Sequence, residues 1–312
     1  MAVYTHIAAE DMARLVEAFG AGALISAKGI AEGVENSNYL VETGEGRFIL
    51  TVYEKRVNSD DLPFFLSLID HLADRGCPVP RARHTQDGGT TIQWQGKFIA
   101  LIEFAAGLSV SHPSPAQARA VGVALGQVHT AAASFPMTRE NSLGPDGWYA
   151  LAARCGDDLD AIRPGLKARV AEECDFLRAH WPVGLPKSVI HADLFPDNVL
   201  MVGNRVSALI DFYFACSEVR AWDVAVTHSA WAFENDGTGY NAAVGDALIA
   251  GYNESFGLSD QEQAAFNTLA RGACLRFLLT RAWDWLNTPA DALVTRKDPL
   301  AFLRRLEHYA SA

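Results

Sequence analysis

Cysteine is scarce in this chain and is not arranged for cross-links or metal binding. The 312 residues include five cysteines, Cys77, Cys155, Cys174, Cys216 and Cys274, which lie far apart and never form a C-x-x-C pair. An odd number of widely spaced cysteines argues against a disulfide framework, and the missing pairs argue against a zinc knuckle. We therefore expect buried free thiols in a reducing compartment.

Long apolar runs are also missing. No stretch reaches the roughly 18 apolar residues that a membrane-spanning helix needs. The opening segment, MAVYTHIAAEDMARLVEAFG, does not have the basic segment followed by an apolar segment that marks a secretory signal. These absences predict a cytoplasmic protein with no membrane partner.

Positive charge is in the minority. Lys and Arg number 26 against 37 Asp and Glu, which gives a formal net charge of -11, and no basic run stands out. Binding to a nucleic acid backbone depends on such cations, so nucleic acid is not an expected partner. A local basic cleft for a nucleotide is compatible with the acidic total.

The composition that remains is that of a globular protein, with 49% hydrophobic and 20% charged residues. A chain of 312 residues favours two domains or one large one. Short β-type runs dominate up to Phe104, and helical apolar spacing dominates after it. We predict an α+β fold, with a nucleotide-binding antiparallel β domain at residues 1–104 and a larger, mainly helical, catalytic and substrate domain at residues 105–312.

The first of these domains is expected to contain five strands and one helix. The helix should run from about Ser59 to Arg75, because Ser59 suits an N-cap and Gly76 and Pro78 follow as stop signals. The strands are expected at residues 24–31, 38–43, 47–54, 90–94 and 97–104.

The second domain is expected to be helical apart from one β-hairpin. Its strands, NVLMV and VSALIDF, are joined by a GNR turn and follow the loop HADLFPDN. The helices are expected at about residues 114–133, 157–180, 219–234, 239–256, 259–286 and 299–309.

The loop and the hairpin carry the residue types that phosphoryl transfer from ATP needs. Asp193 lies in the loop, Asn198 follows five residues later at the first strand, and Asp211 lies thirteen beyond that, at the end of the second. A hairpin brings its two strand ends together, so Asn198 and Asp211 suit Mg²⁺, which prefers a few hard oxygen ligands. Asp193 is the candidate base for the acceptor hydroxyl.

The pattern H-x-D-x-x-x-x-N followed by I-D-F resembles the catalytic and metal loops of kinases, in the aminoglycoside and choline kinase-like branch. Ala192 replaces the arginine of protein kinases, and Tyr213 stands where their glycine would follow Phe212. This resemblance implies a two-lobe protein-kinase-like fold, with Asp193 as base and with Asn198 and Asp211 on magnesium.

The same resemblance implies supporting roles for two further residues. His191 would orient the catalytic loop, and Asp223 in RAWDVAV would brace its backbone. The alternative for Asp223 is an ordinary carboxylate at a helix N-terminus.

Nucleotide binding is expected in the first domain. Glycine and asparagine in GIAEGVENSNYLVET, which includes Gly29, would place backbone N–H groups over phosphates, and KFIALIEFAAG resembles the hinge that binds adenine. The alternatives are an ordinary hairpin turn and an ordinary edge strand. The candidate ATP-binding residues are Gly33, Asn36, Ser37, Asn38, Glu103, Phe104 and Ala105.

One departure from the family pattern concerns the cation that contacts the phosphates. Thr51 stands where the third strand commonly has Lys or Arg, and Lys55 lies about 13 Å further along the same strand face. Lys28 and Arg56 are the other candidates. The acidic partner of such a cation, Asp60 or Asp61, is left open with it.

The acceptor is read from a finer resemblance. GVENSNYLVET, VIHADLFPDNVLM with IDFYFAC, and RAWDWLNTPADALVTRKDPLAFLRRL resemble the homoserine kinase branch over essentially the whole chain, which implies phosphorylation of the side-chain hydroxyl of L-homoserine. A zwitterion needs an anion for its amino group and a cation for its carboxylate. The candidate substrate contacts are Asp193, Tyr213, Trp222, Arg281 and Asp284.

Other readings stay open at this point. A kinase of the same fold would act on choline, an aminoglycoside, a fructosamine or methylthioribose. For Arg281 and Asp284, the alternative to a substrate contact is an ordinary surface ion pair. A pseudokinase that only binds is the remaining alternative, favoured by Thr51 and opposed by the intact set of Asp193, Asn198 and Asp211. The oligomeric state is not predicted.

Overall fold

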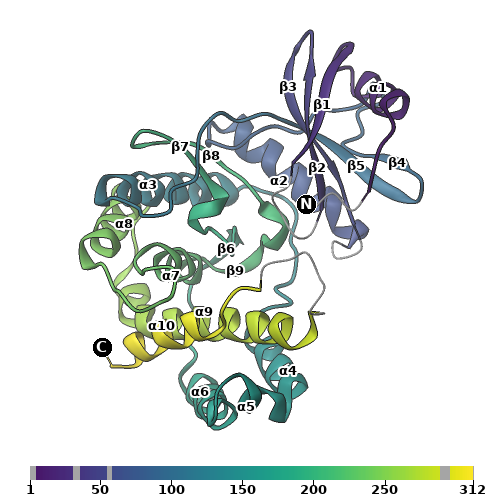
Figure 1. Ribbon diagram of the computed structural model, residues 1–312. Helices are drawn as coiled ribbons and strands as arrows, with labels where there is room; N and C mark the ends of the chain where they lie inside the picture. The colour runs from purple at the N-terminus through teal and green to yellow at the C-terminus, as the bar shows by residue number, and fades with distance from the viewer. Residues whose placement is uncertain (1–4, 31–35, 55–57, 289–295, 312) are drawn as a thin grey trace. The chain divides into compact units, whose positions relative to one another are not determined.

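A computed structural model describes residues 5–30, 36–54, 58–288 and 296–311 of the chain (Figure 1). The chain forms two compact units. The first consists of Met1–Gly107 together with Ser207–Tyr213, and the second consists of Leu108–Val206 together with Phe214–Ala312.

The first unit is built on a five-stranded antiparallel sheet with the order β1-β2-β3-β5-β4. Each strand was predicted close to its observed place, because alternating side chains and glycine turns mark strands locally. The strands are β1 (Leu24–Ile30), β2 (Ser37–Thr43), β3 (Gly46–Val52), β4 (Ile92–Trp94) and β5 (Lys97–Glu103).

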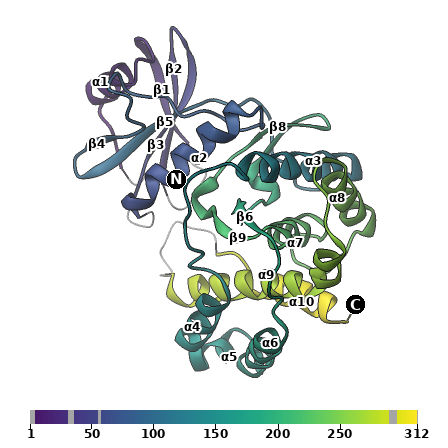
Figure 2. The ribbon, with the colours of Figure 1, turned by 180° about the vertical axis from the view of Figure 1, so that it is seen from behind.

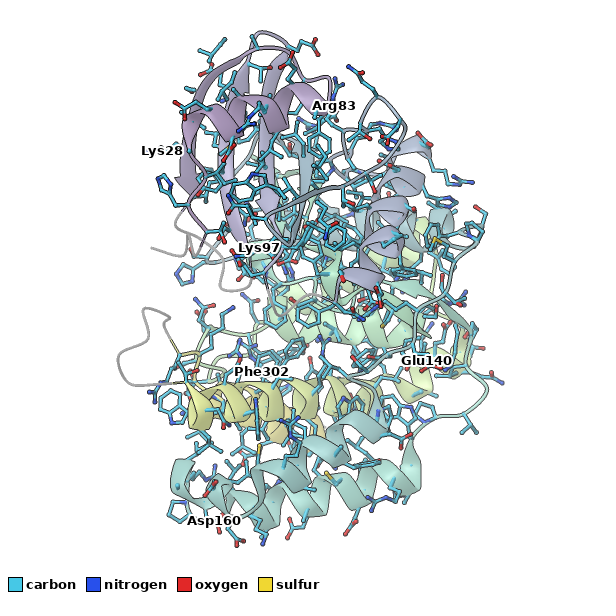
Figure 3. All side chains as sticks on the ribbon, turned by 90° about the vertical axis from the view of Figure 1, so that its right-hand side faces the viewer. Lys28, Arg83, Lys97, Glu140, Asp160 and Phe302 are labelled. Atoms are coloured by element: carbon cyan, nitrogen blue, oxygen red, sulfur yellow. The ribbon has the colours of Figure 1, made fainter. Side chains whose placement is uncertain are left out.

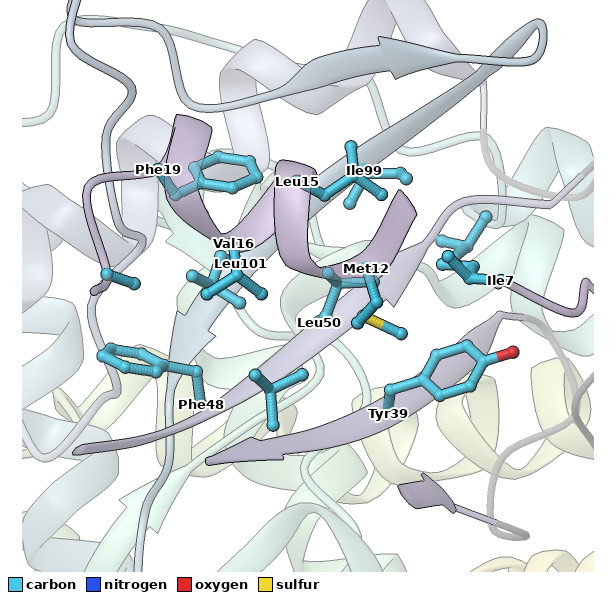
Figure 4. Close-up of a cluster of buried hydrophobic side chains, with 13 residues drawn as sticks. Ile7, Met12, Leu15, Val16, Phe19, Tyr39, Phe48, Leu50, Ile99 and Leu101 are labelled. Carbon is cyan, nitrogen blue, oxygen red and sulfur yellow. The ribbon is translucent and has the colours of Figure 1, made fainter. Parts of the chain in front are cut away.

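Helix α1 (Ala9–Ala18) covers one face of this sheet (Figure 4). Met12, Leu15 and Val16 project from the helix into a buried cluster with Leu50 and Ile99 of the sheet. Burying each such side chain contributes about 1.5–3 kcal/mol. The expectation of a single helix in this part of the chain was therefore wrong, since the i, i+3, i+4 spacing of these side chains already marked α1.

The predicted helix after the third strand is present, with a different start. A short 3-10 turn, η1 (Ser59–Asp61), leads into α2 (Leu62–Asp74). The cap is Asn58, whose side chain accepts a hydrogen bond from the Asp60 N–H at 3.2 Å, rather than Ser59. The stop at Gly76 is confirmed, and this glycine has a left-handed φ of 78°.

The second unit is mainly helical, and none of the described helices is both long and apolar enough to cross a membrane. Five of the predicted helices are confirmed. Ser114 and Ser259 begin two of them with capping boxes, which satisfy the exposed N–H groups of the first turn. These five are α3 (Pro115–Ala132), α7 (Arg220–Trp231), α8 (Ala242–Ser255), α9 (Asp260–Asn287) and α10 (Leu300–Ser311).

The helix predicted at residues 157–180 was wrong as a single element. Pro164 and Gly165, the latter with a φ of 81°, interrupt it. An additional helix before it, which begins at Pro145, was not predicted. The observed elements are α4 (Pro145–Cys155), the 3-10 turn η2 (Gly156–Asp158), α5 (Leu159–Ile162) and α6 (Leu166–His180).

Helices α3 and α8 lie side by side, as both ribbon views show (Figure 2). Two glycines permit the close approach. A Cβ at Gly122 would lie 2.1 Å from the Leu248 carbonyl oxygen, and a Cβ at Gly251 would lie 2.1 Å from that of Arg119.

Four short strands complete the molecule. The predicted hairpin is confirmed as β7 (Val199–Val202) and β8 (Arg205–Leu209), with Gly203 at a φ of 63° in its turn. Strands β6 (Lys187–Ile190) and β9 (Cys216–Val219) pair antiparallel and were not predicted. Their short runs gain strand geometry only by pairing with each other across the intervening chain. Two more 3-10 turns are present: η3 (Pro196–Asn198) ends the loop between β6 and β7, and η4 (Phe212–Phe214) lies shortly after β8.

Candidate active site

Asp193 and Asn198 lie together in the loop between β6 and β7. The Asn198 side-chain amide Nδ2 donates to the Asp193 backbone oxygen at 2.8 Å and to Asp193 Oδ2 at 3.2 Å. Both donors of the amide group are thus engaged with Asp193. The Asn198 Oδ1 atom is the part of this side chain with the right chemistry for a hard cation.

His191 holds the backbone of the same loop from inside. The Asp193 N–H donates to His191 Nδ1 at 3.2 Å, and His191 is only 1% exposed. This hydrogen bond joins the buried His191 ring to the backbone of Asp193, two residues later. This geometry limits the orientations of Asp193.

Asp223, in the first turn of α7, accepts two backbone hydrogen bonds from the loop. Its Oδ2 accepts from the His191 N–H at 2.8 Å and its Oδ1 accepts from the Ala192 N–H at 2.7 Å. Asp223 is fully buried, so its charge depends on these donors. The carboxylate links α7 to the loop that carries Asp193.

A second pair of buried side chains supports Asp223. His129 Nε2 of α3 lies 3.0 Å from Asp223 Oδ2, and His129 Nδ1 lies 2.9 Å from the Tyr252 hydroxyl of α8. Burial alone raises the pKa of Asp223, but hydrogen bonding and charge from His129 and from His191 outweigh it and leave the pKa lowered. His129 and Tyr252 were missed, because a lone histidine on an apolar helix face carries no sequence signal of this contact.

Ala192, next to Asp193, has a left-handed backbone with a φ of 65°. This conformation costs a residue with a side chain about 1–2 kcal/mol. An NH1 group of Arg276 on α9 donates to the Ala192 carbonyl oxygen. Arg276 was not predicted, although a charged residue within the apolar run ACLRFLL is a signal of a buried cation.

Aromatic packing fixes the remainder of the loop. The Phe195 ring lies 4.8 Å from that of Phe277 on α9 and 5.9 Å from that of Phe302 on α10, which is labelled in Figure 3. The Trp231 indole N–H donates to the Leu194 carbonyl at 3.0 Å. Three helices of the second unit thus hold the loop that contains Asp193 and Asn198.

Asp211 belongs to the first unit. It is exposed and left-handed, with a φ of 66°, and it follows β8, where the Leu209 N–H donates to the Pro78 carbonyl at 2.7 Å. The Tyr213 hydroxyl lies 3.0 Å from that of Tyr53. Burial, followed by the neighbouring Tyr213, raises the pKa of Tyr53 well above its usual value. Asp211 is among the charges that act on Tyr53, so it belongs to the surroundings of the Tyr53–Tyr213 pair.

The glycine-rich segment is described only in part. Gly33 lies outside the described residues, and Gly29 is exposed on β1. Asn36 Oδ1 accepts from the Glu54 N–H at 3.3 Å, and the Ser37 hydroxyl donates to Glu54 Oε1 at 2.8 Å. Because both side chains are buried, these two residues have only their backbones to offer a nucleotide.

Thr51, at the position of the expected cation, is bonded to Asn38. Its hydroxyl donates to Asn38 Oδ1 at 2.9 Å. Lys28 is exposed on β1 (Figure 3). It pairs with Leu40, which in turn pairs with Ile49, so Lys28 lies on the same face of the sheet as Thr51, two residues after Ile49. Lys55 and Arg56 lie outside the described residues.

Lys97 of β5 serves the opposite face of the sheet. Its ammonium group contacts the Glu54 carboxylate and the Thr5 hydroxyl. This ion pair lies beside the cluster under α1, to which Ile99 and Leu101 of the same strand belong. Of the three cations considered for the phosphates, Lys28 is the one within the described residues; Arg47 of β3 shares the Thr51 face but stacks on Phe104.

The predicted hinge residues are the last residue of β5 and the two that follow it, and two of their backbone N–H groups are hydrogen-bonded within the first unit. The Glu103 N–H donates to the Arg81 carbonyl at 2.9 Å, and the Phe104 N–H donates to the Arg47 carbonyl at 3.0 Å. The Arg47 guanidinium also stacks 4.4 Å from the centre of the Phe104 ring. The carbonyl of Glu103 and the N–H of Ala105 are therefore the groups on which an adenine-binding proposal rests.

The remaining predicted substrate residues lie in different surroundings. Trp222 is fully buried, and its indole N–H has no hydrogen-bond partner among the described residues. Arg281 on α9 donates to the Asp298 carbonyl at 3.3 Å and stacks on Phe302. Burial, and then repulsion by Arg305, lowers the pKa of Arg281 to about 10. Asp284 is exposed one turn further along α9.

Comparison with known proteins shows the family of this chain. Residues 26–263 match the phosphotransferase enzyme family, a span that contains the catalytic loop, the hairpin and Asp223. The chain belongs to the phosphotransferase enzyme family. The matched span includes parts of both units.

Several relatives in this family are homoserine kinases. One from Zymomonas mobilis is 49% identical over 314 residues, which cover 100% of this chain and 98% of the relative. One from Rhizobium etli is 49% identical over 99% of this chain and 96% of the relative. One from Nitrobacter winogradskyi is 50% identical over 98% of this chain and 94% of the relative.

Solved structures of other phosphotransferases share the fold. An amicoumacin kinase in complex with AMP-PNP and Ca²⁺ has a TM-score of 0.72 at 15% identity and covers 92% of this chain and 88% of its own. A spectinomycin phosphotransferase in complex with ADP and its antibiotic has a TM-score of 0.69 at 16% identity and covers 97% and 95%. A choline kinase from Cryptosporidium parvum has a TM-score of 0.65 at 14% identity and covers 92% and 88%. The predicted kinase-like α+β fold is confirmed.

Proposed function

We propose that this phosphotransferase moves the γ-phosphoryl group of ATP to the side-chain hydroxyl of L-homoserine and releases O-phospho-L-homoserine and ADP. The observation that carries the proposal is the identity of about half of all residues, over both units, with homoserine kinases of several bacteria. Antibiotic and choline kinases share only the fold, at 14–16% identity. The product belongs to threonine biosynthesis, and we propose a cytoplasmic location.

Asp193 is the proposed base. When the acceptor oxygen attacks the γ-phosphorus, its proton passes to the Asp193 carboxylate while the bond to the bridging oxygen of ADP breaks. His191 and Asn198 hold Asp193 through hydrogen bonds of 3.2 Å to its N–H and its Oδ2. Pre-arranged orientation of this kind supplies much of the rate in phosphoryl transfer.

Asn198 and Asp211 are the proposed magnesium ligands. The donor set fits, because the Asn198 amide nitrogen is engaged by Asp193 and leaves an amide oxygen, and Asp211 adds an exposed carboxylate. Bound Mg²⁺ would neutralise negative charge on the β- and γ-phosphates. The left-handed backbone of Asp211, with a φ of 66°, is strain of the kind that active sites retain.

ATP is proposed to lie against the first unit. Gly33, Asn36, Ser37 and Asn38 are proposed to contact the phosphates, and the Glu103 carbonyl with the Ala105 N–H would receive adenine. Lys28 is the proposed phosphate cation, since it is exposed on the face of the sheet that carries Thr51. A lysine is suited to this task because its ammonium group acts as a mobile point charge.

The acceptor carboxylate is proposed to bind Arg281. This guanidinium is half-buried on α9, and Asp193 is among the charges that act on it. Homoserine is small, so a cation near the base reaches its carboxylate while the hydroxyl faces Asp193. Asp284 and Tyr213 remain proposed contacts of the acceptor. Trp222 is fully buried, so its proposed role is to support the acceptor site by packing.

The experiment is an ADP-release assay with purified protein, Mg-ATP, and L-homoserine, choline, methylthioribose or kanamycin as acceptor. We expect turnover with L-homoserine, and ³¹P NMR of the product should show a phosphate monoester on the side chain. L-2-Aminobutyrate is the matched control, because it lacks only the hydroxyl and should release no ADP above the background. Faster turnover with any other acceptor would overturn the substrate assignment.

A further inference from the structure

A fully buried arginine lies directly beneath the catalytic loop. Arg276 projects from α9, and its side chain is 2% exposed. Phe277, Phe214 and Trp222 surround its guanidinium, with ring centres 4.4, 5.3 and 5.6 Å from the Cζ atom. Such a setting favours an apolar side chain, since a buried charge loses its hydration.

The charge of Arg276 is only partly compensated. Its NH2 group lies 3.8 Å from Asp193 Oδ1, which is beyond hydrogen-bond distance, and its Nε has no hydrogen-bond partner among the described residues. A partly exposed arginine on the same helix is paired much more tightly. Arg271, five residues earlier on α9, makes two hydrogen bonds of 2.7 and 2.9 Å to Glu173.

The close partner of Arg276 is a backbone atom. Its NH1 group donates to the Ala192 carbonyl oxygen, while the Asp223 carboxylate accepts from the Ala192 N–H at 2.7 Å. The two faces of Ala192 are thus held by groups of opposite charge, from α9 and α7. Ala192 has a φ of 65°, which an alanine does not hold without such constraint.

We propose that Arg276 is a positioning residue for phosphoryl transfer: it holds Ala192 in its left-handed conformation and thereby aims the Asp193 carboxylate. A peptide rotation at Ala192 would swing the following residue, and misplacement by about 1 Å costs about a hundredfold in rate. Because Arg276 is buried, it acts through the loop and does not touch either substrate.

The role predicts opposite effects on activity and stability. Arg276→Met keeps a long apolar stem among the three aromatic rings and removes the charge, so the melting temperature should stay unchanged or rise. The kcat per folded enzyme should fall about a hundredfold, with KM for ATP and for the acceptor within about threefold of wild type. Arg276→Lys, which retains a cation that donates, should recover about tenfold of that loss.

Arg271→Met is the matched control on the same helix. It leaves Glu173 buried without this partner, so the melting temperature should fall while kcat per folded enzyme stays within about twofold. Circular dichroism at the assay temperature gives the folded fraction for every variant. If Arg276→Met does not fold, Arg276→Gln replaces it under the same expectations.

A crystal structure of the Arg276 variant provides a readout that does not depend on any acceptor. We expect Ala192 outside the left-handed region and a displaced Asp193 carboxylate. Retention of φ near 65° with Asp193 in place would overturn the proposal, and so would a kcat within about threefold of wild type or a Lys variant as slow as the Met variant.

The inference rests on the proposed function only in taking Asp193 as the base. The kinetic comparison uses whichever acceptor the wild-type enzyme phosphorylates, so turnover of a different alcohol counts against homoserine alone. A wild-type enzyme inactive with every acceptor counts against the proposed function, and the geometry of Ala192 in the variant still decides the role of Arg276.

Discussion

His129 on α3 lies 3.0 Å from the carboxylate of Asp223 on α7, and both side chains are fully buried. The carboxylate can only accept, so the proton between them belongs to His129 Nε2. The pair joins two helices at the point where Asp223 also receives the N–H groups of His191 and Ala192. His129 therefore supports the loop that contains Asp193 indirectly, through Asp223.

Replacement of His129 by Phe should lower the free energy of unfolding of the protein. The ring shape is kept, but Asp223 loses a buried donor, which costs about 3 kcal/mol. Tyr252→Phe removes only the outer hydroxyl and should cost about 1 kcal/mol. Urea denaturation measures both, and equal midpoints for the two variants would contradict the ranking.

Asp193→Asn should abolish the transfer step with little effect on nucleotide binding. The amide keeps the shape of the side chain but does not accept the acceptor proton, so kcat should fall about a thousandfold. ATP affinity, measured by calorimetry with Mg²⁺ present, should stay within about threefold. The matched control is Asp197→Asn, an exposed neighbour in the same loop, which should retain most of the activity.

Asp211→Asn should weaken the magnesium-dependent part of nucleotide binding. A neutral amide is a poorer ligand for a hard cation, so KM for Mg-ATP should rise about tenfold or more. Raising free Mg²⁺ from about 1 to 20 mM should restore part of the rate, which it would not do for Asp193→Asn. Binding of ATP without metal should be nearly equal in the variant and the wild type, and a variant with unchanged Mg-ATP affinity would count against Asp211 as a ligand.

Arg281→Met should raise KM for the acceptor. A lost charge-assisted hydrogen bond to the carboxylate corresponds to about 10- to 100-fold in affinity. Arg304→Met is a suitable control, because Arg304 is exposed and contacts the same Asp298. If both variants bind homoserine as wild type does, the carboxylate contact lies elsewhere.

Protonation of His228 should make the fold acid-sensitive. Burial, followed by the charge of His308, lowers the pKa of His228 from 6.5 to about 4. The unfolded chain therefore binds the proton more readily, and stability falls as pH drops from about 6.5 towards 4, by about 2 kcal/mol between pH 7 and 5.

His228→Gln should flatten that pH dependence. Denaturation midpoints at pH 7 and 5 test it, with His112→Gln as the control, since His112 is exposed. An equally steep loss of stability in the His228 variant would contradict the assignment.

Much of the fold was predictable because its signals are local. The strands of the first unit are short runs of β-favouring side chains bounded by turn residues, and Ser114 and Ser259 mark helix starts within one turn. The breaks at Pro164 and Gly165 are also local, and were overlooked within an otherwise helical stretch. Strands β6 and β9 were not predictable from their own residues, because each becomes a strand only when paired with the other.

The phosphotransferase chemistry was readable from the sequence, because the spacing of Asp193, Asn198 and Asp211 predicts a base and two metal ligands on one loop and hairpin. What holds that loop in place became visible only in the folded chain. The contacts of Ala192 with Arg276 and of Asp223 with His129 join residues 84 and 94 positions apart, so they form only when α3, α7 and α9 pack together. A buried charge has meaning only through the neighbours that folding brings to it.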